Sequence, residues 1–258
     1  MSADPTFEIT ALPALNDNYI WAIHQDSHAI VVDPGEAAPV MAFLKANDLQ
    51  LTAILCTHRH HDHVGGIDEL REVYNVPVYG RCHPNNPHIT HDLKEGDQLK
   101  LDVPTIVFNI IDVPGHLVDH IAFVAPGIVF SGDILFGAGC GRNFEGTLAQ
   151  LQHSLQRLAD LPDNTLVYSS HEYTAANLRF AIACEPDNPE IQQRNQTTQQ
   201  LRAANQITLP THIALEKATN PFLRCTQPEL IHTMQQRGLT DTSELGVFTA
   251  LRLWKNHF

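Results

Sequence analysis

Four histidines and one aspartate fall within six residues of a single stretch, THRHHDHVGG (Thr57–Gly66). An apolar run, LTAILC, precedes it and predicts a buried strand. In an extended chain alternate side chains point the same way, so His58 and His60 can bind one metal ion together. Asp62 and His63 can then turn toward a second ion, since imidazole and carboxylate both bind divalent transition metals. The plain alternative is a solvated His-rich turn.

Three more candidate ligands stand where other apolar runs stop. His116 ends TIVFNIIDVPGH, Asp133 ends HIAFVAPGIVFSGD, and His171 lies within TLVYSSHEY. In α/β proteins the carboxyl ends of strands form ligand sites, because side chains far apart in sequence converge there. Together with His58 these residues end four predicted strands, which indicates one site and argues against a solvated turn.

Two regions are expected along the chain. Up to about residue 172, short β-branched runs alternate with amphipathic stretches, including a helix over Ala37–Lys45 and another over IDELREVY. A hairpin is expected over His120–Asp133, with its turn at Pro126-Gly127. From Thr174 onward helical stretches dominate: TAANLRFAIAC, PEIQQRNQTTQQLRAAN, QPELIHTMQQRG and SELGVFTALRLWKNH. These patterns predict an α/β domain over residues 1–172 and a smaller helical domain over 173–258.

Composition indicates an ordinary globular protein, with 258 residues, 43% hydrophobic and 17% charged. No apolar run approaches the roughly 18 residues that span a bilayer, and the N-terminal MSADPTFEIT does not resemble a secretory signal. The five cysteines are scattered without a CxxC, which is typical of reduced structural thiols. We therefore expect a cytoplasmic protein that does not act at a membrane, and we expect a monomer.

The net charge of −13 argues against nucleic acid as a partner, because phosphate binding normally leaves a basic stripe. It also sets a condition for an anionic substrate. The chain must gather some of its 16 basic residues locally to attract such a molecule.

The motif order resembles the metallo-β-lactamase superfamily: T-H-x-H-x-D-H after a strand, a downstream Gly-His, then Ser-Gly-Asp and a late Ser-His-Glu. Within it the chain is most similar to the glyoxalase II family, the hydroxyacylglutathione hydrolases. The supporting segments are LNDNYIWAI, GCGRNFEGT, HEYTAANLRFA, NPFLR and LRLWK. The resemblance implies an α/β fold, namely an αββα sandwich with a smaller all-helical C-terminal domain. It also implies two divalent metal ions, zinc first, with iron or manganese as alternatives.

Carried over to this sequence, the resemblance assigns a role to each candidate ligand. The first metal would be held by His58, His60 and His116, and the second by Asp62, His63 and His171, with Asp133 bridging the two. Arg59 and His61 alternate with the candidate ligands His58 and His60, so in an extended chain their side chains point the other way. We expect them to support the site or face solvent.

The resemblance implies hydrolysis of S-(2-hydroxyacyl)glutathione thioesters, such as S-D-lactoylglutathione to D-lactate and glutathione, the second step of methylglyoxal detoxification. Two cations lower the pKa of a shared water and supply hydroxide at neutral pH. That hydroxide would attack the thioester carbonyl, and Asp62 would orient it as a catalytic group. The thiolate can leave without being protonated, since thiol pKa values lie near 8.5.

The residues expected around the glutathione moiety are Arg142, Phe144, Tyr173, Arg252 and Lys255. Arg252 and Lys255 are i, i+3 on the last predicted helix and so share a face; a solvated helix end is the plain alternative for both. Many family members have Lys and Tyr where this chain has Arg142 and Phe144. The charge is kept there, but the phenolic hydroxyl is lost.

Other functions remain open at this stage. A β-lactamase would share the ligands but would not need the C-terminal basic pair, and a nuclease would need a basic surface. A persulfide dioxygenase also uses glutathione, but it employs one iron and part of the ligand set. A non-enzymatic metal-binding or redox-sensing protein is disfavoured, because the site keeps open positions beside a basic patch.

Overall fold

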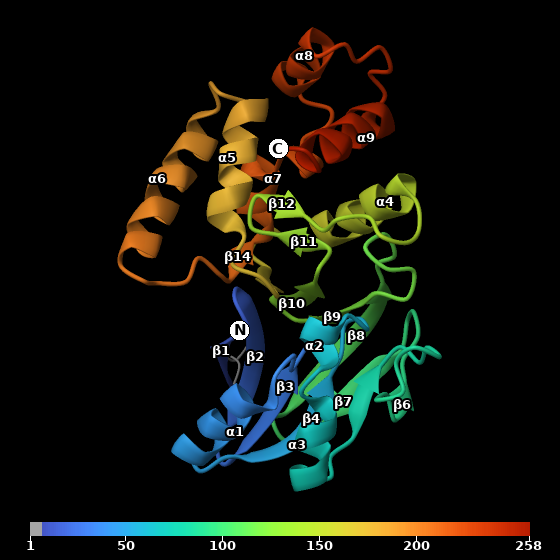
Figure 1. Ribbon diagram of the computed structural model, residues 1–258, viewed down its shortest axis with the longest axis vertical. Coiled ribbons are helices and arrows are strands. Elements are labelled where there is room, and N and C mark those ends of the chain that lie inside the picture. The colour runs from blue at the N-terminus through green and yellow to red at the C-terminus, as the bar shows by residue number, and fades with distance from the viewer. Residues whose placement is uncertain (1–6) are drawn as a thin grey trace. The chain divides into compact units, whose positions relative to one another are not determined.

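The computed structural model describes residues 7–258 (Figure 1). Its internal contacts divide the chain into two compact units. The first unit holds the chain up to Asp112 together with Asp119–Gly132. The second holds Val113–Val118 together with Asp133–Phe258. The chain therefore passes from one unit to the other three times, and the short segment around His116 belongs to the second unit.

A six-stranded sheet in the order β1 to β6 forms the first layer of the first unit. Its strands are β1 (Glu8–Ala14), β2 (Asn18–Gln25), β3 (His28–Val32), β4 (Gln50–Leu55), β5 (Val78–Gly80) and β6 (His91–Asp92). The first three are antiparallel, whereas β3 to β6 run parallel. Parallel neighbours need crossover connections, and α1 (Ala37–Ala46) and α3 (Ile67–Tyr74) provide two of them.

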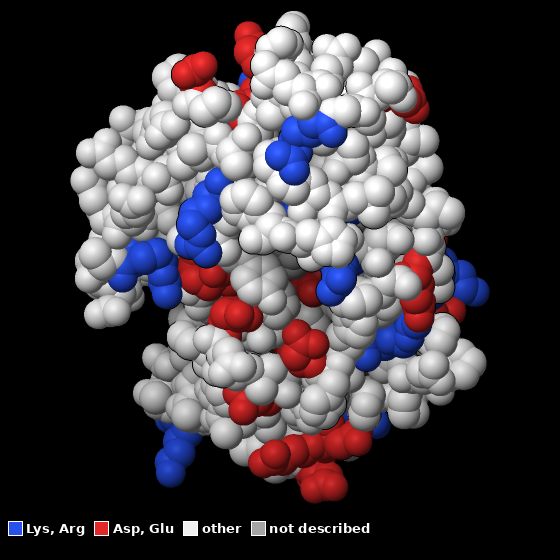
Figure 2. Space-filling model, turned by 45° about the horizontal axis from the view of Figure 1, so that its top comes forward, with Lys and Arg blue, Asp and Glu red and all other residues white. Residues whose placement is uncertain are grey.

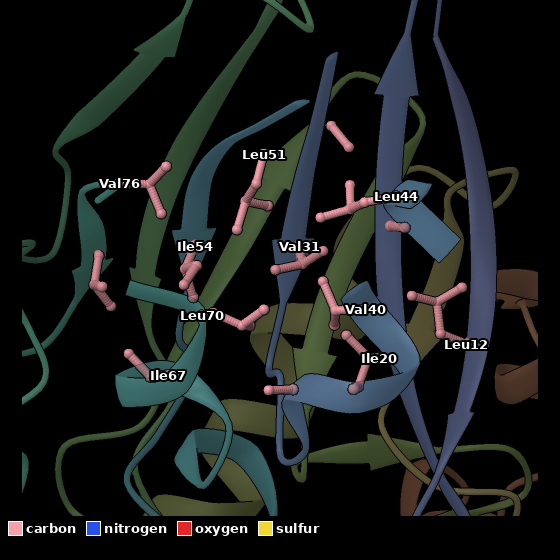
Figure 3. Packing of buried hydrophobic residues seen from close by; sticks show 14 of the residues in the cluster. Leu12, Ile20, Val31, Val40, Leu44, Leu51, Ile54, Ile67, Leu70 and Val76 are labelled. Atoms are coloured by element: carbon pink, nitrogen blue, oxygen red, sulfur yellow. The ribbon is translucent and has the colours of Figure 1, made fainter. Parts of the chain in front are cut away.

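Helices α1 and α3 cover one face of this sheet. Figure 3 shows Val40 and Leu44 of α1 and Leu70 of α3 pointing at strand side chains such as Val31 and Ile54. All five of these side chains are fully buried or nearly so. The apolar spacing along each helix thus forms the expected stripe facing the core.

The opposite face of the sheet is buried as well. Trp21 and Ile23 alternate with Ile20 and Ala22 along β2, and all four are buried. A second set of strands in the first unit pairs antiparallel in the order β10-β9-β8-β7. Their bounds are β7 (Gln98–Leu101), β8 (Ile106–Asp112), β9 (Ile121–Ala125) and β10 (Ile128–Gly132). The Thr105 backbone N–H donates to Oε1 of Gln25 at 2.9 Å, which ties the start of β8 to β2.

Strands β8 and β10 are both antiparallel to β9, so they run in the same direction and end at the same edge. His116 and Asp133 follow these two ends in the chain. This is the arrangement that the strand-end pattern predicted.

The second unit is mainly helical. It contains β11 (Leu135–Phe136), β12 (Gly139–Cys140), α4 (Leu148–Ala159), β13 (Leu166–Ser169), α5 (Thr174–Cys184), α6 (Pro189–Ala203), β14 (Thr211–His212), α7 (Ile213–Thr219), the 3₁₀ helix η1 (Pro221–Leu223), α8 (Pro228–Gln236) and α9 (Glu244–Lys255). The predicted helices correspond to α4, α5, α6, α8 and α9 (Figure 1). One departure is the two-residue strand β14, which pairs with β13 within the otherwise helical C-terminal part. None of the helices between residues 7 and 258 is both long and apolar enough to cross a bilayer.

Candidate metal centre

Two pairs of side chains that could donate to a metal ion directly follow β4 in the first unit: His58 with His60, and Asp62 with His63. Each such set of two neighbouring side chains is called a donor pair below. His58 is buried, and its Nε2 atom lies 3.1 Å from Nδ1 of His60. His60 is the N-cap of a four-residue helix, α2 (His61–Val64), with an extended backbone of φ −62° and ψ 144°. The extended backbone explains why His58 and His60 point the same way, as their spacing predicted.

Helix α2 supplies the second pair. Nε2 of the buried His63 lies 3.4 Å from Oδ2 of the half-buried Asp62. His61, at the first helical position, is exposed, and Arg59 forms an ion pair with Asp119. Arg59 and His61 therefore belong to neither donor pair, as we expected from their alternation with His58 and His60.

The second unit brings His116, Asp133 and His171 together. Nε2 of His116 lies 3.5 Å from Oδ2 of Asp133, and Nε2 of His171 lies 3.4 Å from Oδ1 of the same carboxylate. All three side chains are buried. One carboxylate therefore faces a different histidine with each of its oxygens, as a bridging ligand does.

These separations fit shared metal ions. Two ligand atoms that each lie about 2.0–2.2 Å from one zinc ion, at a tetrahedral angle, are about 3.4 Å apart. The four donor pairs measure 3.1, 3.4, 3.5 and 3.4 Å. The nitrogen and carboxylate donors also match the ligand preference of zinc, iron and manganese. The chain thus carries His and Asp clusters of the kind that bind divalent metal ions.

Asp33 and Asn18 contact two of the candidate ligands, and the candidate residues chosen from the sequence did not include them. Asp33 accepts hydrogen bonds from the backbone N–H and hydroxyl of Thr57, both at 2.7 Å, and its Oδ2 lies 3.0 Å from Nδ1 of His63. Asn18 donates to Oδ2 of Asp62 at 3.1 Å. Such contacts fix the ring orientation of a ligand histidine. Asp33 ends the apolar run AIVV, so the strand-end argument that found His58 also applies to it.

His116 and His171 are each packed against an aromatic ring. Phe144, 58% exposed, meets the His116 ring edge-on at 5.2 Å between centroids. Tyr173 stacks on His171 at 4.6 Å with an interplanar angle of 3°. Nδ1 of His116 lies 2.8 Å from the carbonyl oxygen of Arg142. The structure therefore brings Phe144 and Tyr173 beside two of the predicted ligands.

The three predicted basic residues differ in exposure. Arg142 is exposed, Lys255 is half-buried and Arg252 is buried. Nζ of Lys255 lies 5.1 Å from the ring centre of Phe180, within cation–π distance. Burial lowers the pKa of Lys255, and the positive charges of Arg252 and Arg179 lower it further.

Charge is divided unevenly along the chain. Residues 172–258 carry eight basic and eight acidic side chains and so balance, whereas residues 1–171 carry the whole net charge of −13. On the face shown in Figure 2, basic side chains lie in separate groups with acidic ones between them. The net charge of residues 172–258 therefore repels an anionic substrate less than that of residues 1–171 does.

Comparison with known proteins identifies the family. A model of the metallo-beta-lactamase superfamily matches residues 15–171, and a model described as hydroxyacylglutathione hydrolase C-terminus matches residues 172–258. The hydroxyacylglutathione hydrolases of Nitrosomonas eutropha and Vibrio cholerae are each 47% identical to this chain. Both alignments cover 97% of this chain and 99% of the relative. The chain belongs to the hydroxyacylglutathione hydrolase family.

Solved structures share the fold of this chain. A chain described as ETHE1 from Myxococcus xanthus is 26% identical, with a TM-score of 0.64, covering 96% of this chain and 99% of that one. A chain described as TTHA1623 in a di-iron-bound form is 27% identical, with a TM-score of 0.60, covering 84% of this chain and 100% of that one. The metallo-β-lactamase fold with a helical C-terminal part, predicted from the motif order, is confirmed for this hydroxyacylglutathione hydrolase family member.

Proposed function

We propose that this protein hydrolyses S-(2-hydroxyacyl)glutathione thioesters, converting S-D-lactoylglutathione to D-lactate and glutathione in the second step of methylglyoxal detoxification. The observation that carries this proposal is the match to hydroxyacylglutathione hydrolases along almost the whole chain, including the C-terminal segment. The four closely spaced donor pairs supply the chemistry that such a hydrolysis needs.

We further propose how the donors divide between two ions. The first ion is held by His58, His60 and His116, the second by Asp62, His63 and His171, and Asp133 contributes one oxygen to each. Zinc is the proposed metal, with iron or manganese as alternatives, and a related chain solved in a di-iron-bound form supports two ions per chain. Such ions, when bound, acidify a shared water and polarise the thioester carbonyl.

The protein's own groups orient the reacting atoms. Asn18 donates to Oδ2 of Asp62, which fixes that carboxylate so that it can accept a hydrogen bond from the attacking water. The leaving thiolate needs no general acid, because a thiol has a pKa near 8.5, far below that of an amine leaving from an amide. The reaction therefore requires one oriented nucleophile and no proton donor to sulfur.

Glutathione binding is assigned to a set of basic and aromatic residues: Arg142, Phe144, Tyr173, Arg252 and Lys255. The charged head of Lys255 attracts a glutathione carboxylate, and the exposed guanidinium of Arg142 contributes further positive charge. Phe144 lies edge-on to His116, and Tyr173 stacks on His171. Arg252 contributes to the same region from a buried position.

Residues 1–172 are proposed to form the catalytic domain and residues 173–258 the substrate-binding domain. We also propose a cytoplasmic monomer whose partner is this small thioester, without nucleic acid or a membrane. The negative charge of residues 1–171 is consistent with that choice, since it repels polyanions.

The deciding experiment loads the purified protein with two equivalents of zinc and measures loss of thioester absorbance. We expect turnover of S-D-lactoylglutathione and much slower turnover of an acyl-coenzyme A thioester. No hydrolysis of the glutathione thioester, or a preference for coenzyme A, would overturn the proposal.

A further inference from the structure

A three-residue segment of the first unit, residues 119–121, runs antiparallel to the chain that carries the first donor pair. The Ile121 backbone N–H donates to the carbonyl oxygen of Thr57 at 3.0 Å. Two residues further along the motif, and two residues back along the segment, Arg59 forms an ion pair with Asp119. Both side chains of this pair are only 9% exposed, and removing one partner from so buried a pair is costly.

The middle residues of the two stretches, His58 and His120, are stacked ring on ring. Their ring centroids lie 4.5 Å apart, and their planes differ by 16°. His120 is buried, and its Nδ1 lies 3.0 Å from the carbonyl oxygen of Ile121. Because a carbonyl can only accept, Nδ1 of His120 donates this hydrogen bond. The ring that covers one face of His58 is therefore itself fixed in orientation.

Gly132, at the end of β10, leaves the space that these side chains occupy. Its φ of +49° lies in the left-handed region that favours glycine. A Cβ there would lie 2.7 Å from Cε1 and Nε2 of His120, and 2.4 Å from the hydroxyl oxygen of Thr57. The backbone of β10 thus packs directly against both residues.

These contacts restrain a candidate ligand and the residue after it. Nδ1 of His58 lies 3.1 Å from the hydroxyl oxygen of Thr57, and Nε2 of His58 faces Nδ1 of His60 at 3.1 Å. Arg59 lies between the two histidines in the chain, so its ion pair with Asp119 restrains the backbone that joins them. The separation of the two donor nitrogens is therefore set by contacts that the protein makes with itself.

We propose that residues 119–121 form a brace for the first donor pair. Asp119 and His120 are positioning residues that hold His58 and His60 in a metal-binding geometry, and Arg59 links the brace to the motif. A site that is held ready binds more tightly, because a larger fraction of the protein is competent to bind. This role rests on the proposed ligand set. It gives Arg59 the supporting role that the sequence left open beside exposure to solvent.

The first test removes the charge of the brace and measures zinc affinity by competition with a chromophoric chelator, without substrate. In Asp119→Ala we expect one ion per chain to bind about tenfold more weakly, as is typical when a contact that supports a ligand is lost. Thermal unfolding of the metal-free protein is recorded alongside. A contact that only stabilised the fold would lower the unfolding temperature and leave the zinc affinity of the folded protein unchanged.

A double-mutant cycle tests whether the two charges act as one unit. Arg59→Met alone should weaken the same ion to a similar extent, since it removes the other half of the pair. The double variant Arg59→Met/Asp119→Ala should lose no more than either single variant. Two independent effects would instead multiply to about a hundredfold, and that result would contradict a shared role.

The stacked ring is tested separately. His120→Leu keeps an apolar side chain in the buried position but removes the flat ring and the Nδ1 donor, so zinc affinity should again fall about tenfold. His120→Phe restores a ring that can stack on His58, so its zinc affinity should lie between those of His120→Leu and the wild type.

The matched control is another ion pair of the first unit, between Arg81 and Asp112. Nη2 of Arg81 lies 2.6 Å from Oδ1 of Asp112, and the two side chains are 23% and 35% exposed. Arg81→Met removes a guanidinium of the same kind from a pair that contains no candidate ligand. It should leave the affinity for both ions unchanged even if it lowers the unfolding temperature.

Wild-type zinc affinity in both Asp119→Ala and His120→Leu would overturn the brace and leave residues 119–121 a purely structural part of the fold. If Asp119→Ala does not fold, the double variant decides, because it leaves neither charge without its partner. His58→Ala separates this inference from the ligand assignment on which it rests. A His58→Ala protein that still bound two ions would refute that assignment, whatever the brace variants do. The titrations contain no thioester, so they remain decisive if the protein hydrolyses a different substrate.

Discussion

Both donor pairs of the second unit depend on Asp133. Its two oxygens face His116 and His171 at 3.5 and 3.4 Å, and the residue is 7% exposed. A terminal ligand lost from a site leaves the other ligands of one ion in place. A bridging carboxylate, in contrast, contributes to both ions at once.

Asp133→Ala should therefore bind fewer than two zinc ions per chain. We expect kcat to fall by more than about 100-fold, the upper end of the effect of supporting residues around a metal. Metal content by elemental analysis, alongside thioester turnover, checks this. Asp160→Ala, at the exposed C-cap of α4, is the matched control. A fully active Asp133→Ala protein with both ions would rule out the bridge.

Asp33 shows how a backbone conformation can serve a site. Its φ of +53° lies in the left-handed region, which Asp and Asn tolerate better than most residues. In that conformation its carboxylate meets Thr57 and His63 at the same time. One side chain thus links the end of β3 to the residues before and within α2.

Asp33→Asn keeps the shape and the tolerance of positive φ but removes the charge opposite Nδ1 of His63. We expect zinc affinity at one site to weaken by about tenfold, measured by chelator competition. Asp26→Asn is a control with the same kind of backbone, φ +52°, at an exposed turn. Equal affinities in the two variants would show that the Asp33 charge does not support the ligand.

At the scale of elements, the last helix carries two cations with different surroundings. Arg252 and Lys255 share a face, as their i, i+3 spacing predicted, but they differ in depth. Lys255 lies against Phe180 and Phe258, and its neighbours include the positive charges of Arg179 and Arg252. The burial and the like charges together lower the pKa of Lys255.

The lowered pKa gives KM a pH dependence. Lys255 is charged below its pKa, so the attraction for a glutathione carboxylate is complete at low pH and disappears as the pH rises through that pKa. Because the pKa is lowered, KM should begin to rise at a less alkaline pH than an ordinary lysine, with a pKa near 10.4, would cause. KM profiles corrected for spontaneous thioester hydrolysis check this.

Lys255→Arg should flatten that profile, since a guanidinium stays charged across the range. Lys217→Ala, which removes an exposed lysine paired with Asp163 on α7, should leave it unchanged. A KM profile in Lys255→Arg identical to that of the wild type would assign the pH dependence to another group.

Elements with a long apolar stripe were predictable from the sequence, and short ones were not. Helices α1 and α3 were expected almost at their observed bounds, because their buried residues recur at helical spacing. Helix α2 was missed, since it has only four residues, two of them candidate ligands, and carries no apolar stripe. Strand β14 and helix α7 were missed for a related reason: β14 is only two residues long, and α7 has only seven.

The same contrast holds for the site. The donors could be found because their residue types and strand-end positions are local properties of the sequence. The depth of Arg252 could not be predicted, because it is set by contacts with Cys140, 112 residues away, and with Phe222. Local spacing fixes which face of a helix a residue occupies, whereas burial depends on what packs there.

At the scale of the whole molecule, the five cysteines are free thiols, as their scattering predicted. Cys56, Cys140, Cys184 and Cys225 are buried, and burial raises the pKa of each. Cys82 is exposed. Because a thiol must be accessible and partly ionised to react, Cys82 is the cysteine that we expect to react with a thiol reagent.

A thiol-reactive chromogenic disulfide should label one thiol per native chain and five after denaturation. Some burial and the nearby Asp92 carboxylate raise the pKa of Cys82, so we expect this labelling to be slower than that of a free thiol in solution. Peptide mass mapping identifies the labelled position, and Cys82→Ser should abolish the native reaction. Rapid labelling of a second cysteine in the native protein would contradict the buried assignment.

The threefold crossing of the chain between its units has a consequence for biosynthesis. His116 lies in a six-residue segment that belongs with residues 133–258, although the chain on either side of it belongs to the first unit. On the ribosome this segment emerges before β11, β12 and α9, the elements that fix its surroundings. The contacts around His116 are therefore completed only after these later elements have been translated. A chain interrupted before them would leave this segment without the neighbours that it has in the folded protein.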